Sequence, residues 1–539
     1  MVAHPSRPQL FQSSMDPNFY TWSLRWWPYA VAHGLNPLHS TEVSAPAGSN
    51  LAWVTSIPPL ALLVSPLTAL AGPVVSFSLL VAAAIPTAGW ATFVLARRLT
   101  GRFWPALTAG ALYGFSAYEL NHIYAGQLNL AFSLLLPLMA YLVLLWRDAS
   151  ISSGAFVVLL TLAMVVQFYL FLETFADMTV VWLVALAAGY VLVGRSGRRA
   201  IARLAGLVAA AFGIALVFAS PYLVFALGHI PPGFIRSPAR TSLDLAGLLV
   251  PRTSQTFGMA WLAKYATPLP SPANDGYIGI PLVLIAIALA VVAWSSRLTR
   301  FLIVMLVLLL VGALGPAVRL DGQQIAGLPW ARLWLLPIAQ SAYPARLMVF
   351  VFLALAVIVA VWLARPRRRW WLTGLRWLLA LLAVAVVATN VPALDLTHGR
   401  GLPTFISSGA YRHYLHRGAT VVVISGRGNA GMLWQAETDF YTRLAGGYLN
   451  HAIAQNSDLP PPVAVLESRH VTRGDFVQFR RFLRSANVRA ILVEADWAWD
   501  WPAILSQAGL RGQTIDGVIV YWTPGTPRPG VRLSARLMP

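Results

Sequence analysis

The sequence predicts a polytopic α-helical membrane bundle with a GT-C-like layout, about ten or eleven spans, and a small C-terminal α/β domain. Of the 539 residues, 58% are hydrophobic and only 11% are charged, whereas a soluble domain carries about 25% charged residues. Long apolar runs reach the length of about 20 residues that a helix needs to cross a bilayer. After residue 393, short apolar stretches alternate with helical ones, which is typical of an α/β domain.

The formal net charge of +20 is explained by membrane topology, because Lys and Arg collect in short cytoplasmic loops. A nucleic-acid-binding protein would need a basic face on a known module, and the sequence contains no such module. Cysteine is absent, which excludes disulfides, thiolate metal sites and cysteine nucleophiles. We therefore expect no nucleic-acid partner, no cofactor and no metal.

Ten apolar runs are predicted to span the membrane: 74–96, 103–118, 126–146, 155–172, 174–194, 203–226, 276–296, 300–316, 345–364 and 372–392. Arginine clusters follow the first, third, fifth, seventh and ninth runs, so all of them fall on one side of an alternating topology. By the positive-inside rule that side is cytoplasmic. The loops 227–275 and 317–344 and everything after about residue 393 are then expected outside.

The apolar segment 53–73 is interrupted by Pro58, Pro59 and Pro66, and it is either an eleventh span or an interfacial helix. We favour a helix in the outer interface, because a span would place residues 1–52 in the cytoplasm. The predicted domains are an outer-face interfacial segment (1–73), a transmembrane bundle (74–392) and an extracytoplasmic α/β domain (393–539).

The C-terminal domain is predicted from five elements in order. Strands are expected at Ala419–Ser425, Ala490–Val493 and Val518–Trp522, and helices around Asp475–Ser485 and Trp501–Gln507. The first strand alternates in hydrophobicity and the others are short apolar runs, so strands and helices alternate along the chain.

The first fifty residues are rich in aromatic side chains, and they contain Asp16, Trp22, Arg25, Trp26 and Trp27. Such a composition just ahead of an apolar segment suits a membrane interface. Two readings of the carboxylate stay open. Asp16 is either the N-cap of an amphipathic interfacial helix or a functional group, because a carboxylate at the hydrocarbon boundary is costly unless it is used or paired.

Candidate site residues lie in the predicted outer loops. Glu119, His122 and Tyr124 share one loop, and Glu173 and Asp177 lie at the next outer turn. Glu173 is either functional or engaged in a buried helix–helix hydrogen bond. His122 is more often a satisfied interfacial histidine than a catalyst.

Four outer arginines run against the positive-inside trend: Arg236, Arg240 and Arg252 in the long loop, and Arg346 at the mouth of a span. Either they pair with the outer carboxylates or they hold a phosphate, for which Arg is the best-suited side chain. For Arg346, phosphate binding and a structural ion pair are equally supported by the sequence.

Several short motifs resemble the GT-C membrane glycosyltransferases, which include protein O-mannosyltransferases and lipid A aminoarabinose transferases. The similar features are an Asp in the first outer segment, the stretches Ser56–Leu60 and Leu67–Pro73, and a span ending in Leu95–Gly101. Asp275–Gly279, Gly312–Pro316 and Tyr343–Arg346 are similar to the YfhO-like branch of that superfamily. The resemblance covers most of residues 15–392, and the order of the motifs carries more weight than any one of them.

The resemblance implies a polyprenyl-phosphate sugar as donor and a cell-envelope glycan, lipid or protein as acceptor. It implies that Asp16 is the catalytic base or the residue that orients the acceptor. Glu173 is a second candidate catalytic carboxylate because it interrupts apolar residues at an outer turn. A general base takes the acceptor proton, and fixed cations stabilise the leaving phosphate. Substrate-binding roles are expected for Arg346, Arg236, Arg240, Glu119, His122 and Tyr343. The expected location is the bacterial plasma membrane.

This chain departs from the family layout in two ways. Residues 1–14 are polar and too short to form the membrane helix that precedes the Asp loop in family members, and no Asp-x-Asp motif supports a metal site like that of oligosaccharyltransferases. Two other functions remain open: a transporter or flippase of a lipid-linked glycan, and a non-catalytic envelope scaffold. Transporters tend to show internal repeats with broken helices at the bilayer midplane, whereas the polar residues here cluster at one face.

Overall fold

The computed structural model describes residues 15–229, 241–250, 276–335, 342–366, 369–388, 402–426, 429–447, 459–467 and 471–524. Contacts divide the chain into two compact units. The helical unit comprises residues 79–224 and 234–395, and the α/β unit comprises residues 2–78, 225–233 and 396–539. The two ends of the sequence therefore belong to one unit, and the middle of the sequence forms the other.

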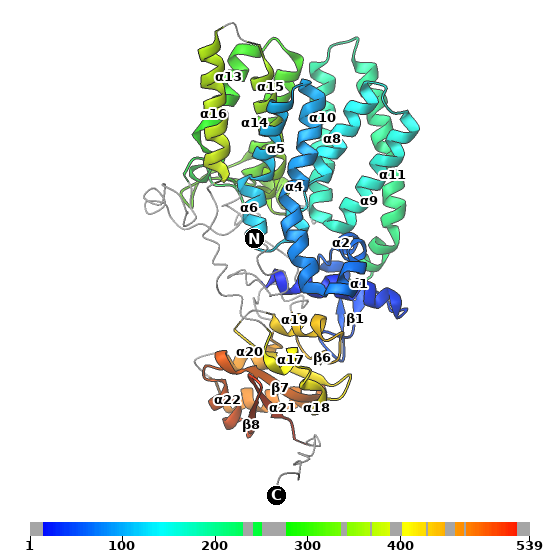
Figure 1. Ribbon diagram of the computed structural model, residues 1–539, viewed down its shortest axis with the longest axis vertical. Coiled ribbons are helices and arrows are strands. Elements are labelled where there is room, and N and C mark those ends of the chain that lie inside the picture. Colours follow the sequence, from blue (N-terminus) through cyan, green and yellow to red (C-terminus); the bar gives the residue numbers. More distant parts are fainter. Residues whose placement is uncertain are drawn as a thin grey trace, which may run out of the picture. The chain divides into compact units, whose positions relative to one another are not determined.

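Each of the ten predicted spans coincides with a helix, and these helices run side by side along the long axis of the helical unit (Figure 1). They are α4 (Pro73–Thr100), α5 (Phe103–Gly114), α8 (Leu135–Arg147), α9 (Ser153–Leu170), α10 (Leu172–Leu192), α11 (Arg198–Leu227), α13 (Gly279–Ala293), α14 (Arg297–Ala313), α15 (Met348–Ala364) and α16 (Trp370–Ala388). Between them lie α6 (Ala117–Tyr124), α7 (Leu128–Ala131) and the hairpin β3 (Ala317–Leu320)–β4 (Gln323–Gly327). The predicted helical membrane bundle is confirmed.

Seven helical stretches of the described residues are long and apolar enough to cross a membrane, which makes this a multi-pass membrane protein: α4, Leu128–Arg147, α9, α10, α11, Pro344–Ala364 and α16. The other three predicted spans form the shorter helices α5, α13 and α14, with 12, 15 and 17 residues. Their apolar runs extend beyond the helix ends into irregular backbone, which hydropathy alone does not distinguish from helix.

Helix α15 forms the centre of the helical unit, because 72% of its span is buried inside the protein, against 11% for α10. It packs against α5, α13 and α14. Large apolar side chains such as Leu183, Val191 and Val217 are exposed on α10 and α11. Exposed apolar surface of this extent is unfavourable in water but suits contact with lipid.

Helices α4 and α5 approach closely through glycines. A Cβ atom added to Gly110 would lie 2.6 Å from the carbonyl oxygen of Gly89, and one added to Gly114 would lie 2.8 Å from the carbonyl oxygen of Ile85. Small residues allow membrane helices to pack backbone against backbone. Any larger side chain at Gly110 would push the two helices apart.

The segment 53–73 does not form an eleventh span. It contains α2 (Pro58–Leu63) and α3 (Ser65–Ala71), with 6 and 7 residues. At 1.5 Å per residue each is roughly 10 Å long, well short of the hydrocarbon core of about 30 Å.

Helix α1 (Asp16–Ala32) packs inside the α/β unit rather than exposing its indole rings. Trp22 and Trp26 are buried, and the indole N–H of Trp22 donates to Gln435 Oε1 at 3.0 Å. Arg25 forms an ion pair with Asp439 at 2.9 Å. These contacts tie the N-terminal segment to α19 (Ala430–Glu437) and the turn that follows it.

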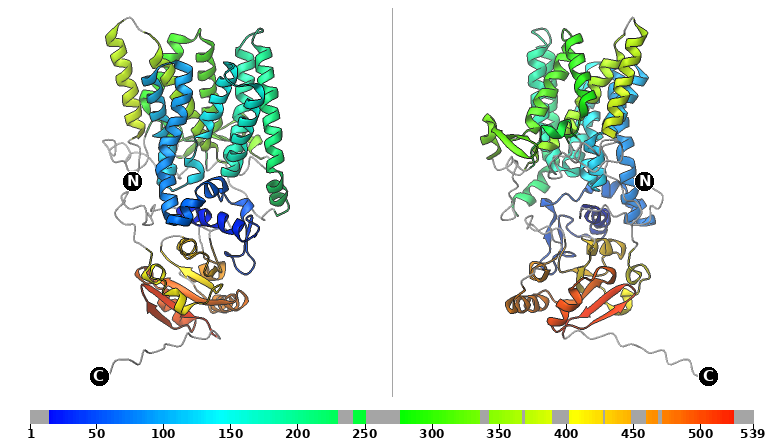
Figure 2. Two further views of the ribbon diagram at one scale, coloured as in Figure 1. Left: turned by 45° about the vertical axis from the view of Figure 1, so that its right-hand side comes forward. Right: turned by 90° about the vertical axis from the view of Figure 1, so that its left-hand side faces the viewer.

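The α/β unit contains a five-stranded mixed sheet in the order β6–β5–β7–β9–β8 (Figure 2). Its strands are β5 (Thr420–Ile424), β6 (Arg443–Leu444), β7 (Val488–Glu494), β8 (Gly512–Ile515) and β9 (Val518–Trp522). β5 is parallel to β6 and β7, and β9 is antiparallel to β7 and β8. The other elements are β1 (His39–Ser40), β2 (Ser49–Asn50), α17 (Thr404–Ser407), α18 (Tyr411–Tyr414), α20 (Pro461–Ala464), α21 (Arg473–Ser485) and α22 (Trp501–Gln507). The predicted C-terminal α/β fold is confirmed.

Candidate functional site

A buried ion pair joins two of the predicted site residues in the helical unit. Glu173 lies in the first turn of α10, and Arg346 lies in the 3-10 turn Pro344–Leu347 that leads into α15. Arg346 Nη1 donates to Glu173 Oε2, and the backbone N–H of Tyr343 donates to Glu173 Oε1 at 2.8 Å. The side chains of Arg346 and Glu173 are only 13% and 18% exposed. The sequence left two roles open for Arg346, phosphate binding and a structural ion pair. The structure contains the ion pair.

Two aromatic rings fix the position of the Arg346 guanidinium. Its central carbon lies 4.1 Å from the ring centroid of Tyr343 and 5.0 Å from that of Phe171. Such cation–π contacts stabilise a cation by about 0.5–2 kcal/mol. A guanidinium has five N–H donors, and only one of them forms a hydrogen bond within the described residues.

Asp177 is a third charged group of this cluster. It follows Glu173 by one helical turn on α10, so both side chains are on the same helix face. It is half-buried, interacts electrostatically with Glu173 and Arg346, and forms no hydrogen bond to the residues that the structure describes. Sequence reasoning noted Asp177 but assigned it no role, although its spacing of four residues from Glu173 was a usable signal.

Glu119 of α6 is fully buried and lies in a separate polar group. Ser133 Oγ donates to Glu119 Oε1, while Glu119 Oε2 has no hydrogen-bond partner in the described part of the chain. Burial raises the pKa of the Glu119 carboxyl well above its ordinary value, although the hydrogen bond from Ser133 opposes the shift. A carboxyl that is buried in this way is poorly placed to contact a polar substrate.

One ring nitrogen of His122 is engaged by a neighbouring side chain. Its Nδ1 lies 2.7 Å from Gln127 Oε1, and its ring is 4.4 Å from the ring of Tyr118 in an edge-to-face arrangement. Tyr118 in turn interacts electrostatically with Arg346. Helix α6 therefore connects to the Glu173–Arg346 pair through Tyr118, a residue that sequence reasoning missed because nothing in its local pattern marks it.

The remaining predicted residues belong to the other unit or lie outside the described residues. Asp16 is the first residue of α1, in the α/β unit, and it is half-buried, with Met15 at the N-cap position. Arg236, Arg240 and Arg252 lie outside the described residues.

An apolar cavity of about 460 Å³ extends through the helical unit. At one end it is lined by Met178 and Phe350, which follow Asp177 by one residue and Arg346 by one helical turn. At the other end it is lined by Leu192 and Arg297. The helical unit therefore contains a large apolar space and, one helical turn before Phe350 of its lining, the guanidinium of Arg346.

Solved structures of two membrane transferases have a similar fold. The archaeal oligosaccharyltransferase AglB from Archaeoglobus fulgidus, in complex with an inhibitory peptide and a dolichol-phosphate, matches with a TM-score of 0.53 at 12% identity, over 96% of this chain and 70% of its own. ArnT from Cupriavidus metallidurans, bound to undecaprenyl phosphate, matches with a TM-score of 0.51 at 13% identity, over 96% of this chain and 95% of its own. At these identities the likeness shows the fold, which is GT-C-like.

No curated protein matches this chain. Residues 7–389 match the family described as a domain of unknown function (DUF6311). This range includes α1, all ten helices of the bundle and the Glu173–Arg346 pair. The chain therefore belongs to the DUF6311 family of multi-pass membrane proteins and has a GT-C-like fold.

Proposed function

We propose that this protein is a glycosyltransferase that moves a sugar from a polyprenyl-phosphate donor to a cell-envelope acceptor at the outer face of the bacterial plasma membrane. The observation that carries the proposal is the apolar cavity of about 460 Å³ in the helical unit, whose lining includes Phe350, one helical turn after Arg346. A lipid phosphate needs an apolar space for its tail and a fixed cation for its head group. The similar AglB and ArnT structures contain dolichol-phosphate and undecaprenyl phosphate, respectively.

In the proposed reaction the acceptor hydroxyl oxygen bonds to the anomeric carbon while the bond from that carbon to the phosphate oxygen breaks. The acceptor proton passes to a carboxylate base, and the polyprenyl phosphate leaves as an anion. Arg346 stabilises the charge that develops on the leaving phosphate, because donors that are already oriented need little reorganisation. We propose Asp16 as the base, as the family resemblance implies.

Glu173 is proposed to act on Arg346 rather than directly on the acceptor. Both of its oxygens are engaged, one by Arg346 and one by the Tyr343 N–H. A carboxylate held in this way positions the guanidinium and Tyr343 together. Asp177 forms no hydrogen bond to the described residues, so its carboxylate can accept the proton of the acceptor. It is therefore a second candidate for the base.

The first test is turnover of a labelled polyprenyl-phosphate sugar by the full chain in vesicles. Arg346→Ala should abolish donor consumption, and Arg346→Lys should reduce it strongly, because Lys cannot form the bidentate fork. Arg98→Ala is the control, since Arg98 is exposed and pairs with Asp148. If donor binding and turnover survive Arg346→Ala unchanged, the phosphate site lies elsewhere.

The second test compares Asp16→Asn with Asp177→Asn in the same assay. A general base contributes about 10²–10⁴-fold to the rate, and Asn retains the shape of Asp without its basicity. The substitution that removes the base should collapse turnover and leave donor binding intact. Near-normal turnover in both variants would contradict a carboxylate base at either position.

A further inference from the structure

A second cavity of about 460 Å³ lies in the α/β unit, where the end of α21 meets the start of β7 and the residues after α22. Its lining contains Arg480 and Arg484 of α21, Arg489 of β7, and Asn487 between them. Apolar side chains, among them Leu483 and Leu510, complete the walls. No acidic residue lines this cavity, which we call the arginine pocket.

Arg480 and Arg484 have no ion-pair or hydrogen-bond partner among the described residues, and both are exposed. They are four residues apart on α21, so their side chains are on the same helix face. Neighbouring like charges destabilise an isolated helix by about 0.2–0.5 kcal/mol. The two guanidinium groups are therefore held together without an internal anion to compensate them.

The helix termini do not account for both Arg480 and Arg484 at this place. The C-terminal end of a helix carries a partial charge of roughly −0.5, which one cation in the last turn offsets. α21 and α22 both end beside the pocket, so together they contribute roughly −1. Arg484 in the last turn of α21 compensates most of this, and the pocket keeps a clear positive excess.

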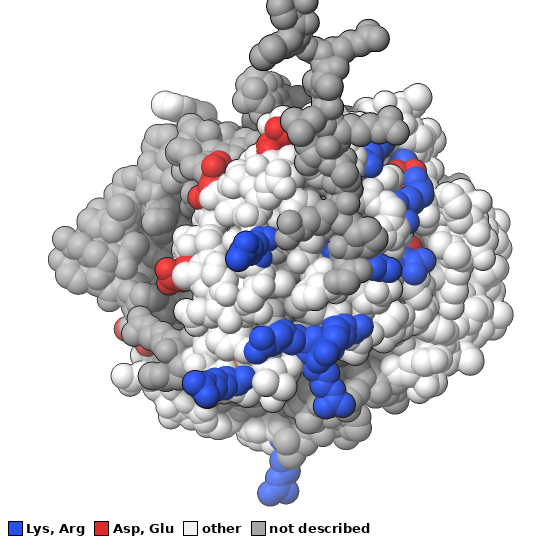
Figure 3. All heavy atoms as spheres, turned by 90° about the horizontal axis from the view of Figure 1, so that it is seen from below, with Lys and Arg blue, Asp and Glu red and all other residues white. Residues whose placement is uncertain are grey.

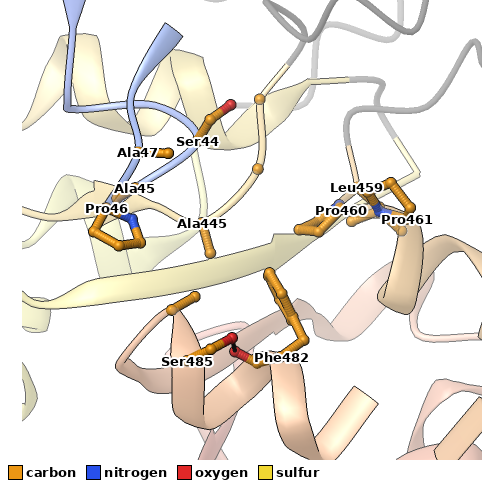
Figure 4. Close-up of a pocket in the computed structure, with 13 residues that line it drawn as sticks. Ser44, Ala45, Pro46, Ala47, Ala445, Leu459, Pro460, Pro461, Phe482 and Ser485 are labelled. Carbon is orange, nitrogen blue, oxygen red and sulfur yellow. Dashed lines mark hydrogen bonds between the residues drawn. The ribbon is translucent and has the colours of Figure 1, made fainter. Parts of the chain in front are cut away.

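The opposite face of α21 provides an internal comparison. There Phe482, Ser485 and Ala486 line a smaller cavity of about 280 Å³, whose lining contains no charged residue (Figure 4). At about 100° per residue, this set lies across the helix from Arg480 and Arg484. Seen from below, basic side chains gather with few acidic ones among them (Figure 3). The positive charge of α21 is thus concentrated on the face that has the pocket.

We propose that the arginine pocket binds a phosphorylated sugar unit of the acceptor glycan, a role that rests on the proposed function. The arginines supply charge-assisted donors for a phosphate, often in bidentate geometry. The volume far exceeds the share of one water, about 30 Å³, and lies in the range of small-molecule sites, about 300–1,000 Å³. The apolar walls suit the ring of a sugar, and Asn487 supplies an amide for its hydroxyls.

The pocket shape favours a sugar phosphate over a membrane surface. Lipid head groups in a plane are met by a flat or protruding basic face, whereas these arginines surround a concave space with apolar walls. A bare phosphate would leave most of the volume empty. The ligand therefore combines an anion with a body of roughly monosaccharide size.

The test is isothermal titration of the detergent-purified full chain, without lipid donor, using glucose 6-phosphate, glucose and inorganic phosphate as probes. Glucose 6-phosphate should bind, inorganic phosphate should bind more weakly, and glucose should not bind. The double variant Arg480→Gln/Arg484→Gln should weaken binding by roughly a hundredfold, about tenfold for each charge-assisted contact. Arg481→Gln is the matched control, because Arg481 is on the same helix but does not line the pocket.

Three outcomes would overturn the proposal: no binding of glucose 6-phosphate to the unmodified protein, an equal loss in the Arg481→Gln variant, or binding only to anionic phosphatidylglycerol vesicles. The same preparations are assayed for donor turnover. Turnover without sugar-phosphate binding would refute the pocket alone. Binding without turnover would refute the transferase and leave the pocket standing as a sugar-phosphate site.

Discussion

The strength of the Glu173–Arg346 pair can be measured with a double-mutant cycle. Glu173→Gln removes the charge but keeps an oxygen that accepts the N–H of Tyr343, and Arg346→Met keeps a long apolar stem between the two rings. Breaking a buried pair by removing one partner costs about 3–5 kcal/mol. Because these side chains remain 13% and 18% exposed, we expect each single substitution to cost about 2–4 kcal/mol.

The double variant should be less destabilised than the sum of the single ones, because it leaves no uncompensated charge. The expected coupling free energy is about 2 kcal/mol, as for a hydrogen bond between charged groups. The measurement is equilibrium unfolding of the purified protein in mixed micelles with increasing SDS, followed by tryptophan fluorescence. Arg98 and Asp148 provide the control cycle, since their side chains are 35% and 30% exposed and exposed pairs couple by about 0.2–1 kcal/mol.

A coupling below roughly 0.5 kcal/mol, the scatter between independent sites, would refute the reasoning. The guanidinium would then be held by the rings of Tyr343 and Phe171 rather than by Glu173. A large coupling would show that Arg346 is oriented before any ligand arrives, as the proposed phosphate site requires.

Three further predictions concern packing, capping and burial. Gly110→Ala should destabilise the helical unit by about 1–3 kcal/mol through overpacking, as measured by the same SDS unfolding. Gly213→Ala on α11 is the control and should be neutral or stabilising, because a Cβ atom at Gly213 meets nothing within 4 Å. The hydroxyl and N–H of Thr472 lower the pKa of Asp475. The carboxylate of Asp475 therefore stabilises α21 above the ordinary Asp pKa of about 3.9, and this stabilisation is lost as the pH falls through the lowered value. Hydrogen exchange of the α21 amides, measured against pH, checks this. Burial raises the pKa of the Glu119 carboxyl. The free energy of unfolding should therefore fall as the pH rises from the ordinary Glu pKa of about 4.3 through the raised value. The Glu119→Gln variant should lack this pH dependence of unfolding.

The sequence predicted the number and order of the bundle helices because apolar runs and arginine loops are local signals. It overestimated the lengths of α5 and α13, since hydropathy continues past the residues that keep helical hydrogen bonds. Helix α14 has the predicted length but starts three residues earlier than predicted. The strands of the α/β unit were also predicted, although β6 and β8 were missed because β6 has 2 residues and β8 is largely exposed.

The candidate site was predicted only in part, because its geometry depends on contacts between distant segments. Glu173 and Arg346 were each identified, yet their pairing depends on how α10 meets the turn before α15. The aromatic composition of the first fifty residues was taken to suit a membrane interface, whereas Trp22 and Trp26 are buried against Phe440. Local composition cannot distinguish an aromatic face that meets lipid from one that meets the other end of the chain.

The joining of the two ends of the chain in one unit constrains how many times the chain crosses the membrane. Trp22 and Arg25 contact Gln435 and Asp439, so the segments before α4 and after α16 must be on the same side. An even number of crossings must therefore separate them. Seven helical stretches qualify by length and hydropathy, and seven is odd. If all seven cross and every crossing lies within the described helices, one or all three of α5, α13 and α14 cross as well, and the bilayer thins around the shorter of them.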